Sequence, residues 1–157
     1  MTRKTNNIGE LDQYDTKILD ILSQNGRITV TELANQVGLS KTPCQARMKR
    51  LESRGYIRGY RAVLDPERLG AAHVAFVEVK LDKTTSETLD AFNRAVHKIN
   101  EVEQCHMIAG GFDYLLKIRA RDIHDYRTIL TEKISSLPHV AQTSNFVSMQ
   151  SVKDAGS

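Results

Sequence analysis

Apolar residues recur every three or four positions along the first third of the chain, which is the spacing of amphipathic helices. Ile18, Leu19 and Leu22 predict a first helix that begins near Leu11 and ends by Gly26. The residues before it are polar and contain no periodic pattern. The chain therefore begins its ordered part with a helix that has one apolar face.

A second, shorter helix is predicted over residues 30–37. Thr29 is a suitable N-cap, because its hydroxyl can accept a hydrogen bond from a free backbone N–H. Gly38 follows at the position where a left-handed residue ends a helix. The apolar stripe of this helix consists of Leu33, Ala34 and Val37.

A third helix is predicted over about residues 41–54, capped by Ser40 and ended by Gly55. Pro43 falls in its first turn, where the missing N–H costs nothing. Its buried face is expected to consist of Cys44, Met48 and Leu51. Two helices joined by a tight turn are the layout of a helix-turn-helix, whose second helix enters the DNA major groove.

Basic and polar side chains cover the other face of this third helix. We expect Thr42, Gln45 and Lys49 to contact base edges, and the neighbouring arginines to bind phosphates. The candidate DNA-binding residues are Lys41, Thr42, Gln45, Arg47, Lys49, Arg50 and Arg54. Residues 41–61 contain seven Lys or Arg against one acid, which suits a phosphate backbone. A solvated helix pair in another fold is the alternative, but turn, caps, spacing and charge all favour DNA binding.

The second half of the chain alternates strand and helix patterns. Residues 74–81 predict a strand, because apolar residues occupy every second position. These residues are Ala75, Val77, Val79 and Leu81. Thr84 and Glu87 resemble a capping box, and the helix expected after them has an apolar stripe. The stripe consists of Leu89, Phe92, Val96 and Ile99.

Two further strands are predicted over residues 102–109 and 112–119. Gly110 and Gly111 separate them, which is a strong hairpin signal. Asp122 is placed to cap a second helix. The inward side chains of that helix are expected to be Ile123, Tyr126, Ile129, Leu130, Ile134 and Leu137.

A last strand is predicted over residues 139–149, so the order of elements is βαββαβ. This order gives a four-stranded antiparallel sheet with two helices on one face, a ferredoxin-like arrangement. The other face stays bare, and we expect it to pack against a second copy of the chain. The apolar side chains expected there are Phe76, Met107, Tyr114, Phe146 and Met149.

The residues between the two halves suggest a short strand or wing followed by a turn or hinge at Asp65–Pro66. The strand residues would be Tyr56, Ile57, Tyr60, Ala62 and Leu64. The fold class is therefore α+β. We expect a DNA-binding domain over residues 1–62, a linker over 63–72 and a second domain over 73–157.

Charge divides the chain in the same way. Residues 1–65 hold eleven Lys or Arg and seven Asp or Glu, whereas residues 66–157 hold eleven and twelve. The basic half is the nucleic-acid candidate. Two distant cysteines argue against a zinc site or disulfide framework and fit a reducing cytoplasm. No apolar run approaches the length of a membrane span, so we expect no membrane partner.

The chain resembles the Lrp/AsnC family of leucine-responsive, or feast/famine, regulators along nearly all of its length. The resemblance lies in LDQYDTKILDILSQNGRITVTELANQVGLSKTPCQARMKRLESRGYIRGYRAVLDPERLG, HMIAGGFDYLLKIRARDIHDYR and ISSLPHVAQTSNFVSMQSVK. It implies a winged helix-turn-helix followed by a βαββαβ (RAM/ACT-like) domain, in a cytoplasmic, nucleoid-associated bacterial or archaeal regulator of amino-acid metabolism. It also implies homodimers that assemble into tetramers or octamers on double-stranded DNA.

The resemblance implies an amino-acid effector at interfaces between second domains. The family's ligand loop, a Gly-containing turn followed by Asp, corresponds to Ile108, Gly110, Gly111, Phe112, Asp113 and Tyr114. The second helix and last strand of the family add Ile123, Ser135, Phe146, Val147 and Ser148. Ser135 and Ser148 are more polar than is usual there, which argues against a simple leucine-type specificity. The stretch VEQCHMIAGGFDYLLKIR resembles PutR-type, proline-responsive activators, so proline and leucine-like amino acids are the candidate effectors.

The chemistry of that loop supports an amino-acid ligand independently of the family. Glycines in a hairpin leave backbone N–H groups free for a carboxylate, and Asp113 suits an ammonium group. The alternative is that Gly110–Gly111 is only a tight turn and Asp113 only a surface strand residue. No cofactor or metal is expected.

Other function classes have weaker support. The five histidines are scattered, and no carboxylate pair, Walker loop, GxSxG or HExxH is present, so we expect no enzyme. Cys105 and His106 are adjacent in a strand and would point to opposite faces. The other alternative is an amino-acid-binding oligomeric module with weak or architectural DNA binding rather than operator-specific control.

Overall fold

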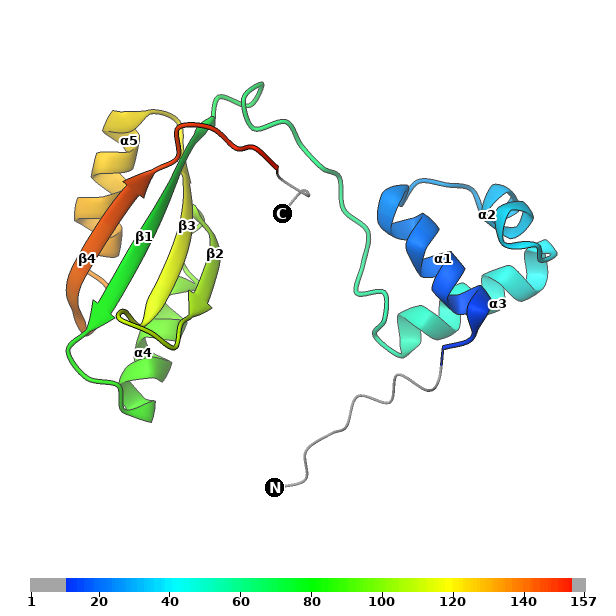
Figure 1. Cartoon of the computed structure of the whole chain (residues 1–157), viewed down its shortest axis with the longest axis horizontal. Coiled ribbons are helices and arrows are strands. Elements are labelled where there is room, and N and C mark those ends of the chain that lie inside the picture. Colours follow the sequence, from blue (N-terminus) through cyan, green and yellow to red (C-terminus); the bar gives the residue numbers. More distant parts are fainter. Residues whose placement is uncertain (1–10, 154–157) are drawn as a thin grey trace. The chain divides into compact units, whose positions relative to one another are not determined.

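The computed structural model describes residues 11–153 of the 157-residue chain. The chain divides into two compact units, Met1–Ala62 and Val63–Ser157 (Figure 1). No helix in the described part is long and apolar enough to cross a membrane.

Three helices form the first unit: α1 (Gln13–Gln24), α2 (Val30–Val37) and α3 (Lys41–Ser53). The sequence predicted all three. Their buried residues form one core, which consists of Ile18, Leu33, Ala34, Val37, Cys44 and Leu51. The core holds α3 against α1 and α2, so the side of α3 that faces away from both helices is open to solvent.

Local hydrogen bonds set where these helices begin. Thr29 and Glu32 form a capping box at α2, and Gly38 ends α2 with a φ of 79°, as predicted. Ser40 occupies the N-cap position of α3, but its side chain makes no capping hydrogen bond, unlike our expectation. Leu39, half-buried against the core, connects the two helices and keeps the turn tight.

The segment after α3 differs from our prediction. Residues 56–64 form no strand, so the short strand expected there is absent from the described part of the chain. The turn predicted at Asp65–Pro66 is formed, because the Asp65 carboxylate accepts hydrogen bonds from the backbone N–H groups of Glu67 and Arg68.

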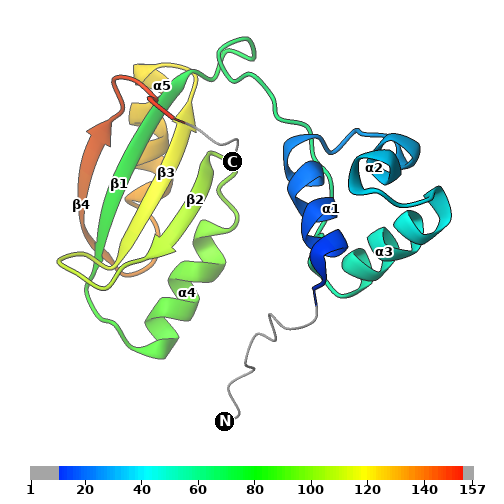
Figure 2. The same cartoon turned by 45° about the vertical axis from the view of Figure 1, so that its right-hand side comes forward.

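The second unit has the predicted βαββαβ order. Its elements are β1 (His73–Leu81), α4 (Ser86–Val96), β2 (Val102–Met107), β3 (Tyr114–Ala120), α5 (Ile123–Thr128), the π-helical turn η2 (Ile129–Ile134) and β4 (Val140–Val147). The strands pair antiparallel in the order β2-β3-β1-β4 (Figure 2). This is the ferredoxin-like sheet, with β2 and β4 at its edges.

The elements of this unit differ from the prediction in three local details. α4 is capped by Thr85, which accepts from the Thr88 N–H, and not by the Thr84–Glu87 pair. The β2–β3 connection spans residues 108–113 instead of a two-residue turn, and its glycines do not adopt the positive φ that such a turn requires. Ile123, expected to point inward, is half exposed at the start of α5.

One face of the sheet and the two helices form the core of this unit. Alternate residues of β1 and β3 lie in it, and the Tyr114 ring packs on Phe92 of α4 at 4.3 Å between centroids. Tyr114 therefore faces the helices and not the bare face where we expected it. On the other face, Phe76 of β1 and Phe146 of β4 lie directly opposite each other.

Candidate DNA-binding surface and effector site

The exposed side of α3 presents the residues that we expected to read DNA. Lys41, Gln45 and Lys49 are all exposed, and their four-residue spacing places them in one row along the helix. Thr42 is exposed beside that row, in the first turn. The N-terminal half of α3 therefore offers donors and acceptors in the geometry by which a recognition helix contacts base edges.

Arg47 and Arg50 point elsewhere. Arg47 Nη1 lies 2.8 Å from Asp15 Oδ1 and 2.5 Å from Asp12 Oδ2, and Arg50 Nη2 lies 2.6 Å from Asp15 Oδ2. The Asp15 side chain is completely buried. Both guanidinium groups thus bridge α3 to the start of α1, a position that we did not foresee when assigning them to phosphates.

The surroundings of these ion pairs reinforce them. The Arg47 guanidinium lies over the Tyr14 ring, 5.2 Å from its centroid. The backbone N–H of Asp15 and then the Arg47 guanidinium lower the pKa of the Asp12 carboxyl, while Asp12 raises the pKa of Arg47. We call Asp12, Asp15, Arg47 and Arg50 the α1–α3 clamp.

Sequence reasoning missed the clamp. Asp12 and Asp15 are recognisable as acids at a helix start, and the structure shows them in a reciprocal capping box. Their partners follow 32 to 35 residues later, and no spacing rule connects positions that far apart. The remaining candidate, Arg54, is the exposed C-cap residue of α3.

The candidate ligand loop is tied to the end of β1. Asp113 Oδ2 accepts a hydrogen bond of 2.8 Å from the Leu81 N–H, and Asp113 Oδ1 lies 3.4 Å from Lys80 Nζ. The backbone N–H of Asp113 donates to Val79 O, and its carbonyl accepts from the Ile108 N–H. A ligand ammonium at Asp113 would therefore share this carboxylate with Lys80.

Within one chain, the candidate effector residues form two groups. The loop at residues 108–113 lies beside Val79–Leu81, whereas Ser148 donates to Val74 O at the opposite end of β1 (Figure 1). Five to seven residues of strand separate these points, or roughly 16–23 Å. The second group comprises Ile123, Phe146, Val147 and Ser148, and Ser135 lies exposed after η2.

The candidate effector residues in and beside the loop at residues 108–113 differ in solvent exposure. Tyr114 is 2% exposed and faces the helices, so its hydroxyl is not part of the loop surface. Ile108 and Phe112 are half-buried, and Gly110 and Gly111 are exposed at the tip. Within residues 11–153, no group of three His, Cys, Asp or Glu side chains is arranged to hold a metal ion.

Comparison with known proteins identifies both units. Residues 74–157 match the model of the Lrp/AsnC ligand binding domain, and residues 11–58 match a winged helix-turn-helix DNA-binding model. The chain is 61% identical, over 94% of both proteins, to a proline dehydrogenase transcriptional activator of Rhizobium radiobacter. It is 44% identical to the leucine-responsive regulatory protein of Escherichia coli K12, over 93% of this chain and 89% of that protein.

A solved structure has the same fold. It is a transcriptional regulator of Neisseria meningitidis in complex with L-methionine, which is 33% identical and superimposes with a TM-score of 0.87. The alignment covers 92% of this chain and 93% of that one. The comparison thus includes both units of the described structure.

Proposed function

The chain belongs to the Lrp/AsnC family of transcriptional regulators, and on that premise we propose that it activates transcription of a proline dehydrogenase gene in response to proline. It is a DNA-binding regulator with an amino-acid-binding domain and not an enzyme. The observation that carries the proposal is the 61% identity to a proline dehydrogenase activator across nearly the whole chain. We place the protein on the bacterial nucleoid, in the cytoplasm.

The test is to titrate the protein into labelled DNA from upstream of the proline dehydrogenase gene and to measure binding by fluorescence anisotropy. The titration is repeated in the presence of each of the twenty amino acids. Proline should change the affinity or the stoichiometry, and unrelated DNA should bind weakly with a steep dependence on salt. Leucine is the second candidate effector, because the leucine-responsive relative is 44% identical. If neither proline nor leucine changed DNA binding, both candidate effectors would be refuted.

In the proposed complex, the exposed row of α3 reads the operator. Lys41, Thr42 and Gln45 are exposed on the N-terminal half of the helix, and Lys49 is exposed one turn after Gln45. These four side chains contact base edges and adjacent phosphates. Arg47 and Arg50 act indirectly, since the clamp carboxylates already bind both guanidinium groups.

Gln45→Ala should change the sequence preference of DNA binding. A glutamine that bonds a base edge contributes about 1–3 kcal/mol of discrimination, so the ratio of operator to mutated-operator affinity should fall about 5- to 160-fold. Competition binding against single-base operator variants measures this ratio. Gln36→Ala, at an exposed position of α2, is the matched control. Equal weakening on every DNA would contradict base reading by Gln45.

We propose further that the effector site is completed by a second copy of the chain. The loop supplies backbone N–H groups and Asp113, while the second group of candidate residues lies at the far end of the same sheet. One residue spans at most about 3.6 Å of extended backbone, far less than the roughly 16–23 Å between the two groups. One amino-acid molecule therefore reaches both groups only where two copies of the chain meet. Dimers formed through the bare face of the sheet then bring the DNA-binding domains into pairs.

Asp113→Asn should abolish the response to the effector and leave basal DNA binding intact. The amide keeps an acceptor for the Leu81 N–H but loses the charge that pairs with an ammonium group. Asp82→Asn removes an exposed acid from the same end of the sheet and serves as the control. Isothermal titration with proline measures both. Unchanged binding in Asp113→Asn would remove Asp113 from the site.

A further inference from the structure

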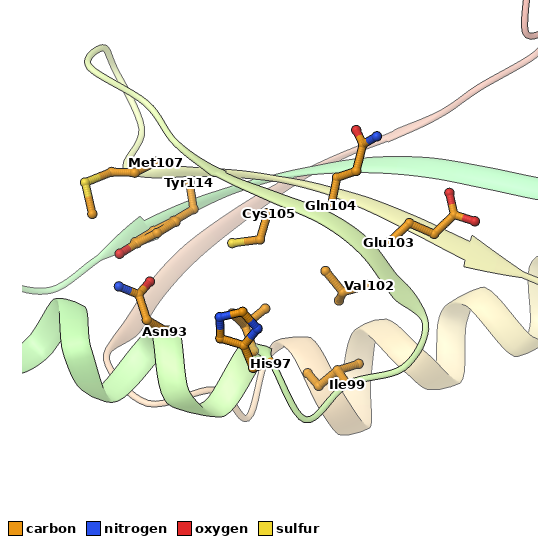
Figure 3. Close-up of a pocket in the computed structure, with 10 residues that line it drawn as sticks. Asn93, His97, Ile99, Val102, Glu103, Gln104, Cys105, Met107 and Tyr114 are labelled. Atoms are coloured by element: carbon orange, nitrogen blue, oxygen red, sulfur yellow. The ribbon is translucent and has the colours of Figure 1, made fainter. Parts of the chain in front are cut away.

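Lys80, near the end of β1, forms an ion pair with the carboxylate of the candidate effector loop, because its Nζ lies 3.4 Å from Asp113 Oδ1. Tyr114, the residue after Asp113, directs its ring toward α4 (Figure 3), and Val79, the residue before Lys80, is buried. Neighbouring residues of an extended strand point to opposite faces, so Asp113 and Lys80 lie on the bare face of the sheet. Lys80 is four residues along β1 from Phe76, or roughly 13 Å, at one end of that face.

The two partners of this ion pair are held to different degrees. The Asp113 side chain is 14% exposed, and its Oδ2 accepts a hydrogen bond of 2.8 Å from the Leu81 N–H. The Lys80 side chain is 46% exposed, and its ammonium group is carried on a flexible four-carbon stem. A ligand ammonium can therefore replace Lys80 at Asp113 Oδ1 while the Leu81 N–H keeps the carboxylate in place.

A zwitterionic amino acid contains the same two charges as this ion pair. Its ammonium and carboxylate groups are attached to one carbon atom, and the charged groups of Lys80 and Asp113 are also adjacent, at 3.4 Å. When the ligand ammonium binds Asp113, the ligand carboxylate therefore comes close to Lys80, and charges of opposite sign alternate. An amine without a carboxylate would instead place its positive charge beside the lysine ammonium, and like charges repel.

We propose that Lys80 is a specificity-determining residue, which leaves Asp113 when the effector binds and pairs with the effector carboxylate. The inference rests on the proposed function, in which Asp113 binds the effector ammonium. Lys80 and Asp113 exchange partners, so both of these charged groups are paired before and after binding. The site thus selects molecules that contain both charges over amines, which lack the carboxylate, and over acids, which cannot displace Lys80 from Asp113.

Isothermal titration of the full chain with matched ligand pairs tests the role of Lys80. The pairs are proline with pyrrolidine and leucine with 3-methylbutylamine, in which each amine lacks only the carboxylate of its amino acid. Lys80→Met keeps an apolar stem of similar length without the charge. It should weaken binding of the effector amino acid about 5- to 50-fold, because a charge-assisted hydrogen bond is lost at a half-exposed position. It should strengthen amine binding, because no ammonium remains to repel the amine.

Lys83→Met is the matched control, because Lys83 is an exposed lysine just after β1, and it should leave both affinities unchanged. Opposite changes for amino acid and amine distinguish the proposed role from a structural one, since a distorted site would bind both more weakly. If Lys80→Met binds the amino acid as tightly as the wild type or more tightly, or loses amino acid and amine together, the role of Lys80 is overturned. If the wild type binds neither proline nor leucine, both candidate effectors are refuted, and this inference with them.

Discussion

Asp15→Asn is expected to destabilise the DNA-binding domain by about 2–4 kcal/mol. The substitution removes a completely buried carboxylate that binds both Arg47 and Arg50. Breaking a buried ion pair at one partner costs about 3–5 kcal/mol, and the range is lowered here because both arginine side chains reach solvent. It also removes the charged half of the capping box at α1.

Calorimetry of the full chain measures this loss as a shift of the DNA-binding domain's unfolding transition by roughly 10–25 °C. Asp20→Asn is the matched control, since Asp20 is an exposed acid on the same helix. Its effect should stay within about 0.5 kcal/mol. Similar transitions in the two variants would show that the clamp does not stabilise the domain.

The clamp also bears on DNA binding. The three ion pairs of the clamp connect the recognition helix α3 to the start of α1 by long-range contacts, so they fix the orientation of the exposed row that includes Gln45. The carboxylates of the clamp pair with both of its arginines. The basic residues of the exposed row are therefore Lys41 and Lys49. The orientation of α3 and its contact surface therefore depend on different residues of one helix.

Phe146→Glu is expected to separate the proposed dimer and to lower operator affinity by at least about 100-fold. Phe146 is half exposed on the bare face of the sheet, opposite Phe76. A carboxylate buried there in a dimer would have to lose its hydration without a designed partner. Loss of the second DNA-binding domain removes the avidity of a linked pair, which is commonly 10²–10⁴-fold.

Analytical ultracentrifugation and operator titration together measure this effect. His124→Glu, at an exposed position of α5, adds the same side chain on a helix and is the control. Phe146→Glu should sediment as a monomer with an unchanged fold by circular dichroism. A variant that remains dimeric with full operator affinity would place the dimer interface on another surface.

The resemblance to a family predicted which residues belong to the candidate effector site, but not where they lie relative to one another in one chain. It selected the loop at residues 108–113 and the end of β4 as parts of one site. The pairing of β1 with β3 and β4 places these parts at opposite ends of the sheet. Residue positions that line one site in a family can thus belong to different copies of the chain, and a single sequence contains no information on that division.

Tyr114 shows a second limit of sequence reasoning. Leu115 and Leu116 are both apolar, so the alternation in this strand does not reveal which parity faces the core. The register of β3 against β1 places Tyr114 opposite Val79, a buried residue, and so directs its ring to the helices.

The sequence by itself determined the three helices of the first unit and the βαββαβ order of the second, because periodicity acts between residues a few positions apart. It wrongly predicted a strand within residues 56–64, where the chain forms none. Thr29 and Gly38 bound α2 as predicted, and the apolar alternation of β1 became its buried face. Only the tertiary structure decided the partners of Asp15, the direction of Tyr114 and the separation of the effector groups. These features depend on contacts across more than 30 residues or on strand register, which packing of the whole domain selects.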